Sequence, residues 1–90
     1  MTRHAQLVDL LKKMFSNAEQ IREFVSSLEG GDRLAGRLSS VSVGRDLYAS
    51  DVVRIGMKGR YVDAAFFARL REVEVLCIPK IDAVARAFGV

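Results

Sequence analysis

One spacing of apolar side chains recurs three times along this 90-residue chain. It starts at Leu7, at Ile21 and at Ile81, and each time apolar residues stand at positions i, i+3, i+4 and i+7. Residues with this spacing lie on one face of an α-helix. Because each helix must bury its apolar face against other elements, the pattern predicts an all-α fold.

Residues typical of helix ends divide the first half of the chain. We predict that Thr2 caps the first helix and that the run 16–19, "SNAE", forms a capping box that opens the second. The glycine pair 30–31 is expected to end the second helix. Asp32 is then expected to cap a short helical turn. These signals predict short helices joined by short connections.

Residues typical of loops and helix ends also divide the second half of the chain. The Ser-, Val- and Gly-rich stretch 39–44 is interpreted as a loop, and a fourth helix is expected over 45–58. Asp63 is expected to cap the fifth helix, and Pro79 and Gly89 to delimit the sixth. The stretch "EVEV" before Pro79 is interpreted as a connector. The whole chain is thus predicted to form a compact antiparallel six-helix bundle.

Two adjacent phenylalanines, Phe66 and Phe67, test this interpretation. Neighbours on a helix point about 100° apart, so both rings are buried only where several elements surround the helix. In a six-helix bundle the fifth helix has such neighbours, and we predict that both rings lie in the core, with Val73 on the same ridge as Phe66. The predicted core consists of Leu7, Leu10, Leu11, Met14, Ile21, Phe24, Val25, Leu28, Val52, Ile55, Phe66, Phe67, Leu70, Ile81, Val84 and Phe88.

The chain has few residues suited to catalysis or metal binding. Cys77 is its one cysteine and His4 its one histidine, so neither an internal disulfide nor a four-ligand zinc site is expected. Cys77 lies in an apolar run and is predicted to be a small buried side chain. Nearly all of the 11 acidic residues fall at caps or on predicted polar faces. We therefore predict a protein that is not an enzyme and binds no cofactor.

Length and hydropathy predict a single domain, residues 1–90, in the cytoplasm. No stretch approaches the roughly 18 consecutive apolar residues that span a membrane. The N-terminal segment "MTRHAQLVDLLKK" is too polar for a secretory signal.

Three segments carry a resemblance to a known family. They are "MFSNAEQIREF", "FFARL" after a Gly-x-x-x-Asp turn, and "IPKIDAVA", and the similarity runs from about Leu7 to Phe88. In these segments the chain resembles the bacterial death-like domains, the effector-associated and CARD-like modules of bacterial defence systems. The resemblance implies a death-fold-like six-helix domain that binds another death-like domain, on a second copy or on an effector protein. It also implies recruitment or clustering of a linked effector, such as a protease or a pore-forming protein.

The charges suggest which faces serve such an association. Candidate basic interface residues on the first and fourth helices are Lys12, Lys13, Arg45, Arg54 and Lys58. Candidate acidic interface residues at the second helix and its end are Glu19, Glu23, Glu29 and Asp32. A basic face and an acidic face join copies head to tail, in a contact that can extend into a filament. Tyr48 and Tyr61 are candidate aromatic anchors for an interface, although the spacing of Tyr48, Val52 and Ile55 also predicts that Tyr48 faces inward.

A nucleic-acid-binding regulator is the alternative hypothesis. The net charge of +3 and the scattered lysines and arginines would support phosphate contacts. Acidic and basic residues alternate along most of the chain, however, and the helix after the glycine pair is too short and apolar to read a DNA groove. We therefore expect protein partners, with nucleic acid as the second possibility.

Overall fold

The computed structural model describes residues 2–90, and it contains helices and no strand over that range. The α-helices are α1 (Arg3–Met14), α2 (Ala18–Ser26), α3 (Gly31–Ala35), α4 (Arg45–Lys58), α5 (Ala64–Val73) and α6 (Ile78–Ala87). Two short 3₁₀ turns, η1 (Val41–Val43) and η2 (Val75–Cys77), precede α4 and α6. The all-α fold and the six-helix bundle are confirmed, and the predicted span of the fourth helix is confirmed at both ends.

Two predicted caps are present. The Thr2 hydroxyl accepts a hydrogen bond from the Ala5 backbone N–H (3.1 Å) at the start of α1. The Asp63 carboxylate accepts one from the Phe66 N–H (3.0 Å) at the start of α5. Each cap satisfies a backbone donor that has no partner within its helix, which stabilises the helix by about 1 kcal/mol.

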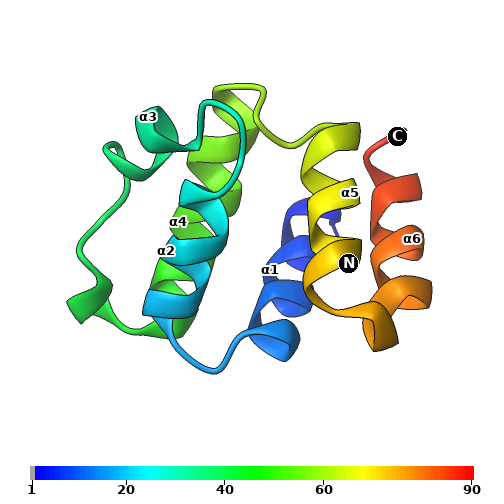
Figure 1. The fold of residues 1–90 in the computed structure, drawn as a ribbon, viewed down its shortest axis with the longest axis horizontal. Helices are drawn as coiled ribbons and strands as arrows, with labels where there is room; N and C mark the ends of the chain where they lie inside the picture. The colour runs from blue at the N-terminus through cyan, green and yellow to red at the C-terminus, as the bar shows by residue number, and fades with distance from the viewer. Residues whose placement is uncertain (1) are drawn as a thin grey trace.

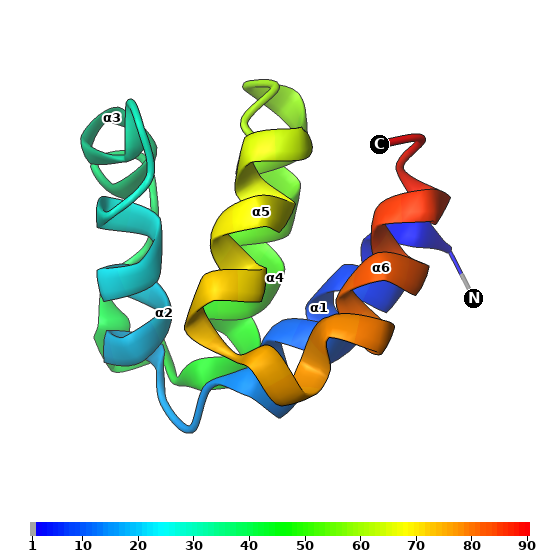
Figure 2. The same ribbon diagram turned by 45° about the vertical axis from the view of Figure 1, so that its right-hand side comes forward.

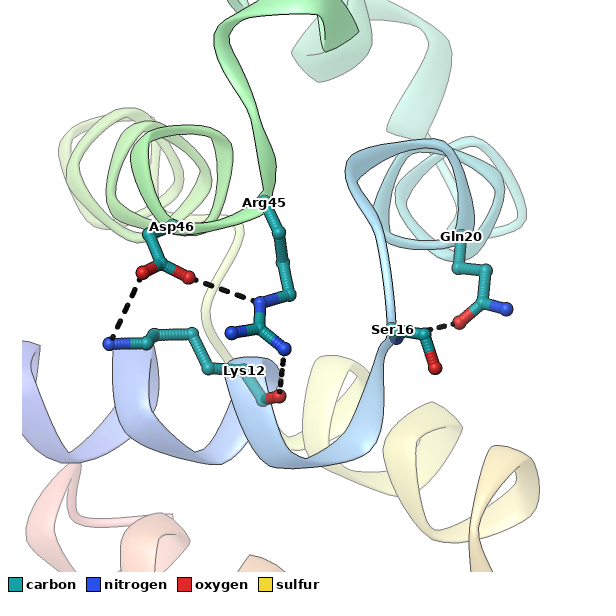
Figure 3. A network of polar contacts seen from close by, with 5 residues as sticks. All are labelled: Lys12, Ser16, Gln20, Arg45 and Asp46. Atoms are coloured by element: carbon teal, nitrogen blue, oxygen red, sulfur yellow. Dashed lines mark hydrogen bonds and ion pairs between the residues drawn. The ribbon is translucent and has the colours of Figure 1, made fainter.

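Two other predicted caps are wrong. Helix α2 is capped by Asn17, one residue after the predicted Ser16, and the Asn17 side chain accepts from the Gln20 N–H (2.9 Å). Gln20 in turn accepts from the Ser16 N–H (2.9 Å), as Figure 3 shows. Glutamine thus occupies the reciprocal position that the sequence analysis gave to Glu19. Asp32 lies inside the first turn of α3, because that helix starts at Gly31.

The helices pack around one core. Helix α1 packs against α4 and α6, α2 packs against α3 and α4, and α5 packs against α6. Figure 2 shows α2 and α3 on one side, α1 and α6 on the other, and α4 and α5 between them, and Figure 1 shows α2 in front of α4. The Cα radius of gyration of 11.6 Å is close to the roughly 12 Å expected for a single folded unit of this length.

Both adjacent phenylalanines are buried, as predicted: Phe66 is 1% exposed and Phe67 is 0% exposed. They stand in the middle of a continuous series of ring contacts, with centroid separations of 5.3–5.6 Å. We call this series the phenylalanine ladder, and its members are Phe15, Phe24, Phe66, Phe67 and Phe88. The ladder links α2 to α5 and α5 to the end of α6.

Most of the predicted core is buried, with some differences at its edges. Met14, Leu28, Ile55 and Phe88 are half-buried and pack against the core from its rim. The prediction that Val73 continues the inner ridge of Phe66 is wrong, because Val73 is the last residue of α5 and is 42% exposed. Cys77, predicted to be buried, is also half-exposed. The buried hydrophobic residues outside the predicted list are Phe15, Ala18, Leu34, Tyr48, Ala49, Val53 and Ala85.

Helix α4 ends in a Schellman motif with an arginine at its left-handed position. The Tyr61 N–H donates to the Gly56 carbonyl (2.8 Å) and the Arg60 N–H donates to the Met57 carbonyl (3.2 Å). Arg60 has φ +61°, and it is the one non-glycine residue with positive φ among residues 2–90. Glycine is the usual residue there, since a Cβ is strained in this conformation. Arg60 therefore makes the α4–α5 turn less stable than glycine would.

We predict that Arg60→Gly raises the free energy of unfolding by about 0.5–1 kcal/mol. Glycine relieves the backbone strain in the folded state, and its greater conformational freedom in the unfolded chain offsets part of that gain. Thermal unfolding should then occur about 4 °C higher. Arg60→Ala keeps the Cβ at the same φ and is the matched control, so it should give no such increase. Equal stabilisation by both substitutions would contradict the strain at this turn.

Candidate interaction surface

Three apolar side chains at the junction between α5 and α6 are exposed. Val73 is 42% exposed, Val75 is 66% exposed and Leu76 is 89% exposed, and together we call them the junction patch. The Glu74 carboxylate accepts a hydrogen bond from the Leu76 N–H (3.2 Å) and so caps η2. Exposed apolar side chains that lie together are typical of protein interaction sites. This stretch was predicted to be a connector, and the exposure of its apolar side chains was not predicted.

A groove of about 350 Å³ lies beside the junction patch, between α2 and α5. Its lining residues come from the end of α1, from α2 and from α5. Val73 belongs to both the groove and the junction patch, and Glu74 lies between Val73 and Val75 in the chain. The buried rings of Phe15 and Phe24, 5.6 Å apart, belong to it. The complete lining is Met14, Phe15, Gln20, Glu23, Phe24, Ser27, Arg69, Val73 and Glu74.

Arg69 bridges the two walls of this α2–α5 groove. Its Nε donates to the Ser27 hydroxyl (3.2 Å), and its Nη1 pairs with the Glu72 carboxylate (2.8 Å). The Ser27 hydroxyl donates in turn to the Phe24 carbonyl (2.6 Å). The positive charge of Arg69 is thus matched by Glu72, while the lining also contains the carboxylates of Glu23 and Glu74. The groove is consequently apolar at its base and acidic at its edge.

The structure brings part of the predicted basic face together at the contact between α1 and α4. Arg45 donates to the Lys12 carbonyl (3.3 Å) and pairs with Asp46 (3.0 Å), and the Lys12 ammonium lies 3.9 Å from Asp46 (Figure 3). Asp46 therefore offsets part of this positive charge. Lys13, the next residue along α1, is exposed.

The other two predicted basic residues lie farther along α4. Arg54 pairs with Asp51 (3.1 Å), which also accepts a hydrogen bond from Ser39. The Ser39 hydrogen bond, reinforced by Arg54, holds the pKa of the Asp51 carboxyl below its ordinary value. Lys58 is on the last turn of α4, roughly 20 Å along the helix from Arg45. The basic residues thus form two separate groups.

Asp51 also gives the contact between Ser39 and α4 a pH dependence. Because the pKa of Asp51 is lower in the folded state, the stabilisation by its carboxylate is present at neutral pH. It is lost as the pH falls through that lowered pKa.

The predicted acidic residues are all exposed, but they too are dispersed. Glu19 and Glu23 lie one turn apart on α2, and only Glu23 lines the groove. Glu29 lies between α2 and α3, where it and Tyr61 line a second hollow of about 240 Å³, and Asp32 is on α3.

The two tyrosines have different surroundings. Tyr48 is a core residue, 1% exposed, and burial raises the pKa of its phenol, so its prediction as an interface anchor is wrong. Tyr61 is half-exposed and remains available for contacts.

Residues 2–90 contain neither a candidate metal site nor a candidate membrane-spanning helix. This part of the chain contains no group of three or more histidine, cysteine, aspartate or glutamate residues arranged to hold a metal ion. None of its helices is both long and apolar enough to cross a membrane.

The comparisons with family models, curated proteins and solved structures give no match to this chain.

Proposed function

We propose that this chain is a non-enzymatic protein–protein interaction module of the death-fold type. In this proposal it associates with a second copy or with a similar domain on an effector, and so recruits or clusters that effector. The observation that carries the proposal is the junction patch, whose Leu76 is 89% exposed beside an apolar groove. Exposed apolar surface of this kind is stabilised when a protein partner covers it.

The helix order supports the death-fold part of the proposal. The resemblance segment "MFSNAEQIREF" runs from the end of α1 through most of α2, "FFARL" lies in α5, and "IPKIDAVA" lies in α6. The biological setting that the resemblance suggests is cytoplasmic bacterial antiphage defence or programmed cell death, with a protease or pore-forming protein as the effector.

Pairs of exposed charges on different helices supply the directionality of the proposed association. Exposed Lys13 and Arg54 belong to α1 and α4, whereas Glu23 and Asp32 belong to α2 and α3. A contact between unlike faces leaves one face of each kind unused at the two ends of a pair, so further copies can add. Complementary charges fix the register of such a contact and accelerate docking.

We predict that Lys13→Glu with Arg54→Glu, and separately Glu23→Lys with Asp32→Lys, each raises the concentration needed for self-association by at least about tenfold. Mixing the two variants should restore association, because the reversed faces are complementary to one another. Sedimentation velocity measures the assemblies, and circular dichroism checks that each variant is folded. The matched control for the first pair is Lys80→Glu with Arg86→Glu on α6, which makes the same change in net charge and should leave association unchanged.

Three results would contradict this proposal. The first is unchanged association of both folded variants, and the second is failure of the mixture to regain it. The third is tight binding of a labelled DNA or RNA oligonucleotide with a steep salt dependence, which would instead favour the nucleic-acid hypothesis.

A further inference from the structure

We propose that the α2–α5 groove binds an amphipathic helix of a partner protein whose apolar stripe is flanked by lysine or arginine. This inference rests on the proposed function, because it takes the chain to be an interaction module. It adds a second binding mode, in which a single helical segment is held in a groove, to the association of whole domains.

The shape of the groove fits one face of a helix. The α2 wall contributes Gln20, Glu23, Phe24 and Ser27, which are spaced as i, i+3, i+4 and i+7. The α5 wall, which includes Val73, runs on the other side. A bound helix inserts residues of the same spacing between two such walls. A groove of about 350 Å³ holds only a few apolar side chains, so the rest of the stripe would need another surface.

The junction patch provides that surface. Val73 belongs to both the groove and the patch, and Val75 and Leu76 follow Glu74 directly in the chain. Covering these side chains removes apolar area from water, which is the main favourable contribution to such binding. An occupant longer than the groove is therefore favoured over a small molecule confined to it.

The charge at the groove selects a basic occupant. Arg69 and Glu72 form an ion pair (2.8 Å), so the carboxylates of Glu23 and Glu74 leave the edge with an excess of negative charge. The whole chain carries +3, but charges more than about 10 Å away are screened at ordinary ionic strength. The local carboxylates consequently determine the preference, and they favour lysine or arginine beside the apolar stripe.

A second copy of the chain is a poorer fit to this groove. All five helices of nine or more residues already bury residues of their own apolar stripes in the core. On α4, Arg45 and Arg54 are paired with Asp46 and Asp51. A free amphipathic segment provides both an open apolar stripe and unpaired cations.

The experiment uses two fluorescein-labelled synthetic helices of 15 residues. Both carry leucines at i, i+3, i+4, i+7 and i+11, and the flanking positions are lysine in one peptide and glutamate in the other. We expect the lysine peptide to bind with a Kd of roughly 1–50 μM in fluorescence anisotropy. The glutamate peptide should bind at least about tenfold more weakly. Equal binding of the two peptides, or no binding of the lysine peptide, would overturn the proposal.

Variants of the groove locate the site. Val73→Lys with Glu74→Gln should weaken binding of the lysine peptide by about tenfold or more. The control pair is Val43→Lys with Asp9→Asn, which changes the net charge equally; Val43 is 40% exposed, both residues lie outside the groove, and binding should be unchanged. Arg69→Gln removes the cation from the lining and should strengthen binding about two- to threefold. Equal effects of the groove pair and the control pair would overturn the proposal.

The same variants separate this inference from the proposed function. Glu23 is left unchanged because it belongs to both the acidic face and the groove. If Val73→Lys with Glu74→Gln leaves peptide binding intact while the charge reversals abolish self-association, the groove proposal fails and the proposed function stands. If the peptide binds as expected and the charge reversals have no effect, head-to-tail association fails and the groove proposal stands. Loss of self-association in sedimentation velocity when the lysine peptide is added would assign the groove to a second copy and overturn the inference.

Discussion

Replacing Phe67 with alanine is expected to lower the free energy of unfolding by about 3–5 kcal/mol. Phe67 is 0% exposed, and its ring centroid lies 5.5 Å from that of Phe66 and 5.6 Å from that of Phe88. Truncation removes the buried apolar area and leaves a cavity that the surrounding helices fill only in part. It also breaks the phenylalanine ladder in its middle. A domain of this size has roughly 5–10 kcal/mol of stability, so the loss is a large fraction of the total.

Urea unfolding followed by circular dichroism at 222 nm measures this effect. Phe67→Leu keeps most of the volume and is expected to cost less than about 1.5 kcal/mol. Phe88→Ala, at the half-buried end of the ladder, should cost clearly less than Phe67→Ala. A loss below about 1 kcal/mol for Phe67→Ala would contradict the central position of this ring.

The burial of both rings shows how far apolar periodicity predicts this fold. Periodicity placed Phe66 on the inner ridge and Phe67 at its edge, and the bundle topology supplied the argument that both are buried. The structure gives the reason: α5 packs against α6 on one side, and Phe66 meets Phe24 of α2, 5.3 Å away, on another. A helix with neighbours on several sides buries more than one stripe. The helices themselves could be predicted from the spacing of apolar residues and from capping residues such as Thr2 and Asp63.

The parts that sequence did not predict depend on packing between distant residues. Nothing local indicates that Arg45 donates to the carbonyl of Lys12, 33 positions earlier, or that Asp46 lies beside both. The sequence therefore indicates which charges α1 and α4 carry, but not which carboxylate pairs with which cation. Tyr48 shares the inner face of α4 with Val52, as its spacing predicts, and this burial contradicts only the other interpretation of Tyr48, as an interface anchor.

The candidate site was missed for a related reason. The stretch before Pro79 has alternating charged and apolar residues, which the sequence analysis interpreted as a connector. In the structure Glu74 caps η2 with its side chain, and Val75 and Leu76 are left exposed. Val73 continues the spacing of Phe66 and Leu70, but it lies at the last residue of α5, where the groove opens. Periodicity indicates which face a residue shares, and the neighbouring helices determine whether that face is covered.

The second large effect is expected at Gly31, where alanine should lower the free energy of unfolding by about 2–3 kcal/mol. A Cβ at this position would lie 1.9 Å from the carbonyl oxygen of Val25 and 3.2 Å from the Cβ of Leu28. The closest atom belongs to the backbone of α2, so it cannot move aside by a change of rotamer. The added methyl would force α3 away from α2 and expose Leu34, which is 0% exposed on α3.

Gly30→Ala is the matched control for Gly31→Ala, and it separates steric contact from backbone conformation. Gly30 has φ +73°, but its added Cβ would meet only a ring carbon of Tyr61 at 3.8 Å, an ordinary contact. Its cost is the strain of a left-handed residue, about 1 kcal/mol. Gly31 has no positive φ, so the whole cost there comes from the contact with α2. Urea unfolding of both variants should therefore rank Gly31→Ala as the more damaging, and the reverse order would contradict the close approach of α3 to the end of α2.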